Sequence, residues 1–193
     1  MRVLDLSNYD WAVDVRNPYW AGQMIQEGIE GVILGCQYPQ IAQAQYRACK
    51  SAGLPVLGVY AEPNVQATID CAHQFNVDMV GIVCEQGGIE TQQDLRDAVT
   101  LVEHAGMIPY IYGNKGDLLY ITSGTTEFTR HPLWFAAYYN DGHIQHVVDI
   151  NGWTKASIHQ YSSTIVVAGR GRDNNWWFEE DEMPDPRVDA IMT

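Results

Sequence analysis

Short apolar runs recur along this chain of 193 residues, and their even spacing is the feature that most limits how the chain can fold. Successive runs begin about 23 to 29 residues apart, but the last begins only about nine residues after the one before it. The runs are residues 2–7, 31–37, 54–63, 78–86, 107–114, 133–139, 157–163 and, more weakly, 166–175. Each is rich in Val, Ile, Leu or Tyr and is continuous rather than alternating, so the runs predict strands that are buried on both faces.

Helical patterns fill the gaps between the early runs. In residues 40–53 the apolar side chains recur at helical spacing, and the pattern stops at Gly53. Residues 64–76 begin with Asn64, a favourable N-cap, and a third helical pattern covers residues 90–106. Strand–helix–strand units of this length are the signature of a parallel sheet, so the sequence predicts an α/β protein.

The later part of the chain lacks helical patterns between its runs. Residues 140–156 are typical of a loop or hairpin, and residues 164–169 are too short for a helix. A full (β/α)8 barrel needs about 250 residues, so eight strands in this chain predict a shortened TIM-like barrel. An open doubly wound sheet is the alternative, but eight roughly equal repeats without a GxGxxG motif favour the closed barrel.

Composition and charge narrow the classes of partner. The length suggests one domain, or two small ones at most, and a hydrophobic content of 46% fits a globular protein. A net charge of −13 disfavours nucleic acid and anionic membrane surfaces, and no apolar run approaches the ~20 residues of a membrane span. Residues 179–193 are acidic and contain two prolines. We therefore predict a barrel over residues 1–178 and an acidic tail or linker after it.

The cysteines and histidines do not indicate a metal site. The four cysteines form no CxxC pair, so we expect buried free thiols rather than a zinc site. His143 and His146 lie three residues apart, but no further ligand accompanies them in the sequence. A solvent-facing loop is the expected setting for both.

Polar or aromatic side chains end nearly every predicted strand, whereas the strand starts are mostly apolar. In a parallel barrel the carboxyl ends of the strands meet at one rim, where catalytic groups lie. We therefore expect a single acidic, aromatic and amide-rich rim. Its predicted members are Asp5, Ser7, Gln37, Tyr60, Glu62, Glu85, Gln86, Tyr112, Asn114, Tyr138, His159, Gln160, Tyr161, Asp173 and Asn174.

Such a rim suits a carbohydrate, because aromatic faces pack on sugar rings while amides and carboxylates bond hydroxyl groups. Cleavage of a glycosidic bond needs one carboxyl that keeps its proton for the leaving oxygen and another that stays ionised. Glu85 leaves an apolar strand in "GIVCEQGG" (81–88). It is the best candidate for a carboxyl with a raised pKa and for the general acid. The alternative is a surface Glu that bonds to a neighbour.

Seven short pieces together resemble one known family from about residue 3 to residue 175. They are "DLSNYD" (5–10), "GLPVLGVY" (53–60), "VCE" (83–85), "IPYIYGN" (108–114), "LWFAAY" (133–138), "HQYSS" (159–163) and "GRDNN" (171–175). No single piece is specific, but their order and spacing resemble glycoside hydrolase family 25, the Chalaropsis-type lysozymes and phage endolysins.

This resemblance implies a (β/α)5(β)3 barrel that uses no metal or cofactor. The implied activity is hydrolysis of the β-1,4 bond between N-acetylmuramic acid and N-acetylglucosamine in peptidoglycan. The resemblance implies that Glu85 occupies the position of the general acid. It implies that Asp5 and Asp173 occupy the positions of two carboxylates that line the site. The predicted substrate-binding residues are Tyr60, Tyr112, Tyr138 and Gln160, together with Glu62, Asn114 and Gln37 from the same rim.

The chain also departs from the family pattern. Val83 stands where the family has a second carboxylate on strand four, and His159 stands where it has a Trp. Strand two ends in "GCQYP" (35–39), which also differs from the family. Electrostatic support of the transition state is often the largest catalytic contribution, so the missing carboxylate is expected to reduce activity, with Glu62 as a candidate replacement.

Two other functions stay open on the sequence. A non-catalytic or retargeted glycan-binding barrel, for example a phage tail or wall-binding domain, is favoured by Val83. A phosphate-binding barrel would use residues 162–171 as an anion loop, but the acidic rim argues against it.

The N-terminal residues bear on where the protein acts. Asp5 interrupts the apolar residues almost at once, so no signal-peptide core is evident. Together with the resemblance, this suits a phage lysin that acts on the cell wall after phage-type release. Without such release, a cytoplasmic location is expected.

Overall fold

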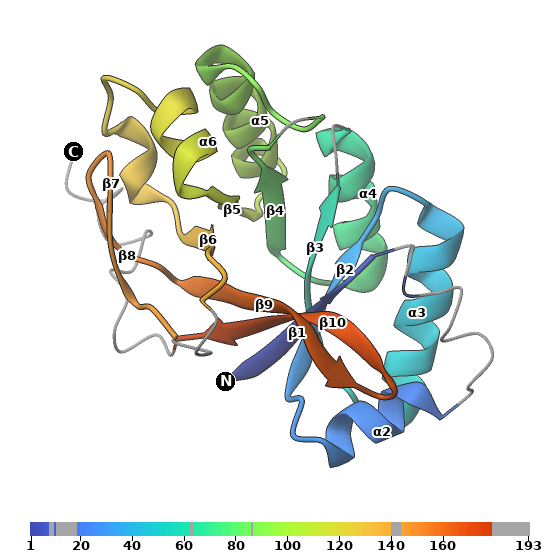
Figure 1. Ribbon diagram of the computed structural model, residues 1–193. Coiled ribbons are helices and arrows are strands. Elements are labelled where there is room, and N and C mark those ends of the chain that lie inside the picture. The colour runs from blue at the N-terminus through green and yellow to red at the C-terminus, as the bar shows by residue number, and fades with distance from the viewer. Residues whose placement is uncertain (8–9, 11–18, 62–63, 86, 140–143, 179–193) are drawn as a thin grey trace.

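Eight strands close into a barrel in the computed structural model, which describes residues 1–7, 10, 19–61, 64–85, 87–139 and 144–178 (Figure 1). The order around the barrel is β1-β10-β9-β6-β5-β4-β3-β2. These strands are β1 (Arg2–Leu6), β2 (Gly31–Gly35), β3 (Val56–Ala61), β4 (Met79–Val83), β5 (Ile108–Asn114), β6 (Leu133–Ala136), β9 (Ile158–Val167) and β10 (Arg170–Trp177). The predicted shortened α/β barrel is confirmed.

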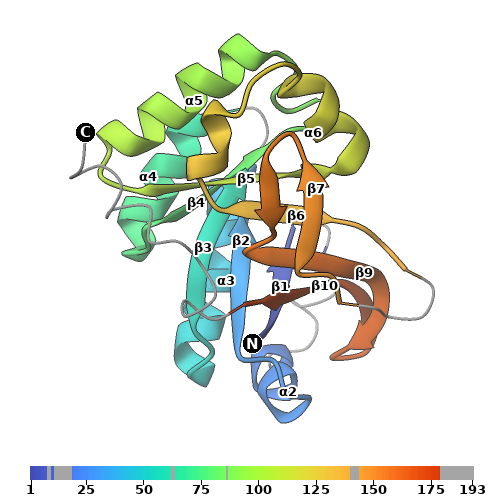
Figure 2. The same ribbon diagram turned by 90° about the vertical axis from the view of Figure 1, so that its left-hand side faces the viewer.

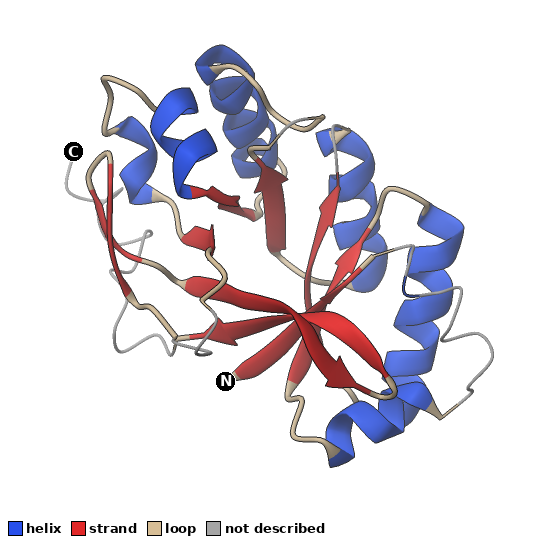
Figure 3. Cartoon of the chain, viewed as in Figure 1, coloured by secondary structure: helices blue, strands red, loops and turns tan. Residues whose placement is uncertain are grey.

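Helices cover the part of the barrel made by the early strands, whereas β9 and β10 carry no helix (Figures 1 and 3). The helices are α2 (Trp20–Gln26), α3 (Pro39–Ala52), α4 (Val65–Phe75), α5 (Gln92–His104), α6 (Lys115–Ile121) and the short 3-10 helix η1 (Glu127–Arg130). Asn64 caps α4 by accepting a hydrogen bond from the amide of Ala67 at 3.0 Å, as predicted. Helix α3 ends at Gly53, whose φ of 80° is left-handed. No helix of the described residues is long and apolar enough to cross a membrane.

The last barrel strand runs against its neighbours, which corrects the expectation of a purely parallel ring. Strand β10 pairs antiparallel with both β9 and β1, while the other neighbouring strands pair parallel. Ala168 and Gly169, both with positive φ, make the tight turn between β9 and β10. Only a hairpin fits here, because a parallel connection needs a crossover of a dozen or more residues.

A second hairpin lies in the region predicted as loop or hairpin. Strands β7 (Val147–Ile150) and β8 (Trp153–Lys155) pair antiparallel outside the barrel, beside α6 in Figure 2. Residues 140–143, which include His143, lie outside the described residues, as does the predicted tail 179–193. The indole nitrogen of Trp153 donates to the carbonyl of His131 at 3.0 Å, so the hairpin is tied to the chain entering β6.

The apolar core has two parts that follow the strand alternation. One part fills the space between the helices and the outside of the barrel, and it includes Val80, Ile82 and the four cysteines, which are buried free thiols as predicted. The other part lies inside the barrel and is made of Val3, Ile33, Met79, Tyr110, Trp134 and Ile158. Side chains alternate between the two faces of a strand, so Val83, two residues beyond Gly81 and four beyond Met79, faces the barrel interior.

Candidate active site

Asp5 is the most buried carboxyl group inside the barrel, and it is held by two amides. Gln160 on β9 and Asn175 on β10 each donate a side-chain N–H to Asp5 Oδ2 at 2.8 Å. Asn175 is itself fixed by Trp134, whose indole nitrogen donates to Asn175 Oδ1 at 2.8 Å. Strands that lie far apart in the sequence therefore hold one carboxyl group in a single orientation.

Asp173 lies directly opposite Asp5 in the antiparallel pairing of β1 with β10. Directly opposed residues share a face, with Cβ atoms about 4.5–5.5 Å apart, and like charges in such a pair repel. Burial, and then the neighbouring Asp173 charge, raise the pKa of Asp5 to about 8, although the two amide bonds oppose this. Burial, and then the charge of Asp10, raise the pKa of Asp173 to about 6. The pair therefore holds a proton at neutral pH.

Two tyrosine hydroxyl groups lie beside this carboxyl pair. Tyr112 and Tyr138 both donate to Gln160 Oε1, at 2.9 and 2.6 Å. Tyr138 keeps 56% of its surface exposed, so it can present an aromatic face to a bound sugar. Burial raises the pKa of both hydroxyl groups, and the charges of Asp5, Asp173 and Glu85 raise it further. Three carboxyl groups from distant parts of the chain therefore act electrostatically on one pair of tyrosines.

Tyr60 reaches the same interior from β3. Its ring packs edge to face against the indole of Trp134, with 5.8 Å between the ring centroids. The ring of Tyr112 packs against the same indole, also edge to face, with 4.8 Å between the centroids. A side chain at Gly81 would lie 2.9 Å from Tyr60 Cβ, so the glycine leaves the room that these rings occupy. Trp134 thus supports the floor below the carboxyl groups.

Glu85 lies directly after the buried strand β4, where the chain makes a tight turn. The amide of Gly88 donates to the Glu85 carbonyl at 2.9 Å, and the amide of Ile89 donates to the Val83 carbonyl at 2.7 Å. Gly87 has a φ of 91°, which favours glycine. Glu85 continues the inward alternation of β4 and is half-buried. The two glycines therefore end the strand and hold Glu85 at the rim.

Gly88 is the position in this turn that tolerates a side chain least. A Cβ there would lie 2.3 Å from the Val83 carbonyl oxygen, which is backbone and cannot swing away. We expect Gly88→Ala to lower the free energy of unfolding by roughly 1–3 kcal/mol and to displace Glu85. Urea denaturation measures this. The control is Gly22→Ala in α2, where a Cβ meets nothing within 4 Å; equal stability of the two variants would contradict the expectation.

Val83 is an apolar part of the wall of this site. It is 3% exposed, lies opposite Tyr112 in the β4–β5 register and faces the interior. The position where the resembled family has a carboxylate therefore contributes no charge here. Glu62, the predicted replacement, lies outside the described residues.

Two predicted substrate-binding residues do not join this cluster. Gln37 is exposed in the turn that leads from β2 into α3. Asn114 caps α6 instead: its Oδ1 accepts from the Asp117 amide at 3.1 Å and its Nδ2 donates to Asp117 Oδ2 at 2.5 Å. The strand-end argument fails for Asn114 because a residue that ends a strand can also begin the next helix.

His159 also differs from its predicted place at the rim. It is fully buried, its Nδ1 accepts from the Gln145 amide at 2.8 Å, and its Nε2 lies 2.9 Å from the Ala137 carbonyl. Its ring packs on Phe135, on the helix-facing side of the sheet. His159 therefore links β6 and β9 to the chain before β7, rather than lining the site.

Residues 162–171 do not make an anion loop. They form the end of the β9–β10 hairpin, and no helix follows them in the described residues. Among the described residues no group of three or more His, Cys, Asp or Glu side chains could hold a metal ion. Trp134, Asn175 and Asp10 belong to the structure of the site but were absent from the predicted set. Asn175 could have been found, because it is two residues from Asp173 and so shares its face.

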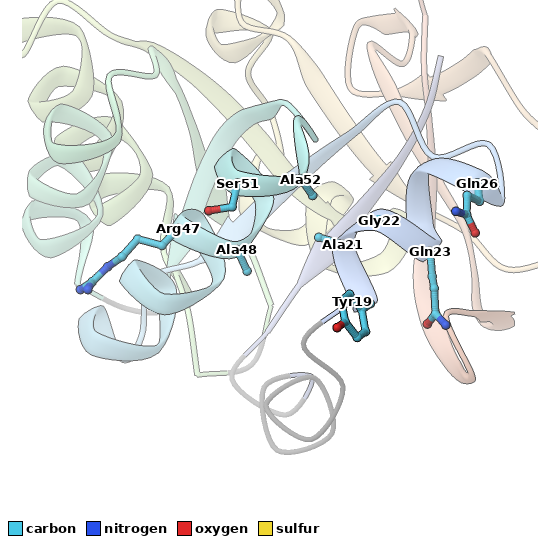
Figure 4. A pocket seen from close by; sticks show the side chains of 9 residues that line it. All are labelled: Tyr19, Ala21, Gly22, Gln23, Gln26, Arg47, Ala48, Ser51 and Ala52. Carbon is cyan, nitrogen blue, oxygen red and sulfur yellow. The ribbon is translucent and has the colours of Figure 1, made fainter.

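A separate groove of about 810 Å³ lies between α2 and α3 (Figure 4). Its floor consists of small residues such as Ala21, Gly22 and Ala48, with Tyr19 and Arg47 at its sides. Among the residues that the structure describes, no carboxyl group lines it. The groove is therefore distinct from the carboxyl cluster inside the barrel.

The fold and the site together define the class of protein: a (β/α)5(β)3 barrel with carboxyl groups gathered at one end. Two relatives from Dictyostelium discoideum match short segments. Probable GH family 25 lysozyme 5 is 36% identical over 47 residues, and probable GH family 25 lysozyme 2 is 35% identical over 57 residues. These segments span 24% and 30% of this chain, and 22% and 27% of the relatives. No protein-family model matches the chain.

Two solved structures share the fold over almost the whole chain. The glycosyl hydrolase 25 GHIP of Streptococcus pneumoniae superposes with a TM-score of 0.70 at 15% identity, covering 97% of this chain and 89% of that one. The CTP1L endolysin superposes with a TM-score of 0.68 at 19% identity, covering 93% and 67%. These comparisons confirm the predicted resemblance to the lysozymes and endolysins of glycoside hydrolase family 25, and they confirm the fold.

Proposed function

We propose that this protein is a muramidase-like hydrolase that cleaves the β-1,4 bond between N-acetylmuramic acid and N-acetylglucosamine. The observation that carries the proposal is that Gln160 joins Asp5 to the hydroxyl groups of Tyr112 and Tyr138, with Asp173 opposite Asp5 and with the charge of Glu85 acting on the same hydroxyl groups. The similarity to two Dictyostelium proteins named as GH family 25 lysozymes, and to the structures of a glycosyl hydrolase 25 and an endolysin, supports it.

In this proposal the carboxyl groups have different tasks. Glu85, half-buried at the end of β4, donates a proton to the leaving glycosidic oxygen. Asp173 is ionised above pH 6 and faces the positive charge that develops on the sugar. Asp5 keeps its proton up to about pH 8, so it can donate a hydrogen bond to the substrate. Environments that separate the pKa values of neighbouring carboxyls are typical of such sites.

The substrate-binding surface is aromatic and amide-rich. Tyr138 offers an exposed ring, while Tyr112 and Gln160 offer polar groups next to Asp5. Peptidoglycan, an extended glycan outside the cytoplasm, is the proposed partner, and the proposed place of action is the cell wall.

The test is digestion of purified peptidoglycan followed by mass spectrometry of the released fragments. We expect soluble fragments whose new reducing ends are N-acetylmuramic acid, because hydrolysis frees the anomeric carbon of the N-acetylmuramic acid and leaves the 4-hydroxyl group on the N-acetylglucosamine. Fragments with N-acetylglucosamine at the reducing end would show that the other glycosidic bond of the glycan is cut, which would contradict the proposed specificity. The absence of fragments would contradict hydrolysis.

A glycan-binding barrel without hydrolytic activity is the second candidate function. The buried, apolar Val83 favours it, because it removes a charge that could stabilise a positive transition state. Sedimentation with insoluble cell wall separates the two candidates. Binding without release of fragments would favour the binding barrel, whereas release of fragments would exclude it.

A further inference from the structure

Asp10 closes the turn that follows β1, five residues after Asp5. Its Oδ2 accepts from the backbone amide of Ser7 at 2.8 Å and from the Ser7 hydroxyl at 3.0 Å. The Asp10 amide donates back to the Ser7 carbonyl at 3.2 Å, and Gln45 of α3 donates to the same carbonyl at 3.0 Å. Asp10 therefore fixes the chain just beyond the strand that carries Asp5.

The other oxygen of Asp10 is paired with β10. Arg172 Nη1 donates to Asp10 Oδ1 at 3.0 Å, and Arg170 Nε lies 3.7 Å from the same oxygen. Arg172 is 2% exposed, and its Nε donates to the Val167 carbonyl at 3.1 Å. A buried ion pair thus joins two segments that are 162 residues apart in the sequence.

The ion pair lies immediately behind the carboxyl pair. Arg172 is the neighbour of Asp173 on β10, and Asp173 is the register partner of Asp5 on β1. A buried ion pair of this kind contributes little net stability compared with apolar residues of similar volume. Its geometry instead fixes how the ends of β1 and β10 lie against each other.

We propose that Asp10, held by Arg172, is a positioning residue that keeps the Asp5–Asp173 pair in register and places a third negative charge behind it. The proposal rests on the proposed function for its role in a reaction, but not for its test. Asp10 contributes to the raised pKa of both carboxyl groups. Within the described part of the chain, the other charged or titratable groups that act on the cluster are Glu85 after β4, Tyr112 on β5, Tyr138 after β6, and Arg170 and Arg172 on β10.

The test follows the carboxyl carbons of Asp5 and Asp173 by NMR during a pH titration of the folded protein without substrate. We expect Asp10→Asn to lower both titration midpoints by roughly 0.5–1 pH unit, because it removes a nearby negative charge but keeps an oxygen that accepts from Ser7. Arg172→Lys keeps the charge but shortens the reach to Asp10. Asp10 is then less neutralised, so the midpoints should rise.

Opposite shifts in the two variants would support the proposal. A purely structural ion pair predicts lower melting temperatures with unchanged midpoints, and that result would overturn it, as would shifts in the same direction. Glu127→Gln is the control, because it breaks an exposed pair with Arg96 at 2.6 Å and should leave the midpoints unchanged. Either variant alone can overturn the proposal if the other fails to fold. Absence of wall hydrolysis in the wild-type protein would contradict the proposed function but would leave this titration informative.

Discussion

Glu85→Gln is expected to lower the rate of peptidoglycan hydrolysis by about 10²- to 10⁴-fold, because a glutamine cannot donate the proton that the leaving oxygen needs. The side chain keeps its size, and the turn that carries it is held by backbone hydrogen bonds of Gly88 and Ile89. We therefore expect the melting temperature and sedimentation with cell wall to stay unchanged. Turbidity loss of a cell-wall suspension measures the rate.

The matched control for this variant is Glu103→Gln. Glu103 lies on α5 and pairs with the exposed Arg130 at 3.3 Å, on the helical layer outside the barrel. The Glu103→Gln variant should clear cell wall at the wild-type rate. Equal clearing by Glu85→Gln and the wild-type protein would remove Glu85 from the role of acid. A loss of wall binding in Glu85→Gln would instead indicate that Glu85 serves in binding.

Asp5→Asn is expected to make the protein more stable at pH 8. The pKa of Asp5 is raised from 3.8 to about 8 in the folded state. The folded protein therefore binds more protons than the unfolded chain between these values, and the free energy of unfolding falls as the pH rises through this window. Asn has no charge to bury and can still accept from Gln160 and Asn175, so we expect a gain of about 1–4 kcal/mol at pH 8.

Urea denaturation at pH 5 and pH 8 measures this effect. The wild-type protein should be less stable at pH 8 than at pH 5, and Asp5→Asn should show a smaller difference. The control is Asp97→Asn on the exposed face of α5, which should keep the pH dependence of the wild type. If Asp5→Asn also kept that dependence, the raised pKa of Asp5 would be contradicted.

Most of the barrel could be predicted because strands buried on both faces leave continuous apolar runs. The direction of β10 was missed, although the short interval before it is too small for a parallel crossover. Asp173 was predicted at the rim as the end of a parallel strand, but it arrives from mid-strand on an antiparallel one. Asp173 therefore lies beside Asp5 as expected, but because the two residues are partners in an antiparallel strand pair and not because two parallel strands end at the same rim.

The site residues show where a pattern of strand ends is informative and where it is not. Asp5, Tyr112 and Gln160 meet because their side chains share the inward face of neighbouring or opposed strands. Asn114 and Gln37 also end strands, but they serve a helix cap and a surface turn. The buried supports Trp134 and Asn175 could not be chosen from apolar spacing, since their roles depend on the register between strands.

The pairing of β1 with β10 has a consequence for how the barrel closes. Strand β1 pairs on one edge with β2, which is near in the sequence, but its other edge pairs with β10, and Asp5 and Asn175 on these two strands are 170 residues apart. Until β10 is in place, the sheet has an open edge, which is prone to association with other chains. The carboxyl pair of the interior is thus assembled only when the barrel closes, so a chain without β10 would lack it.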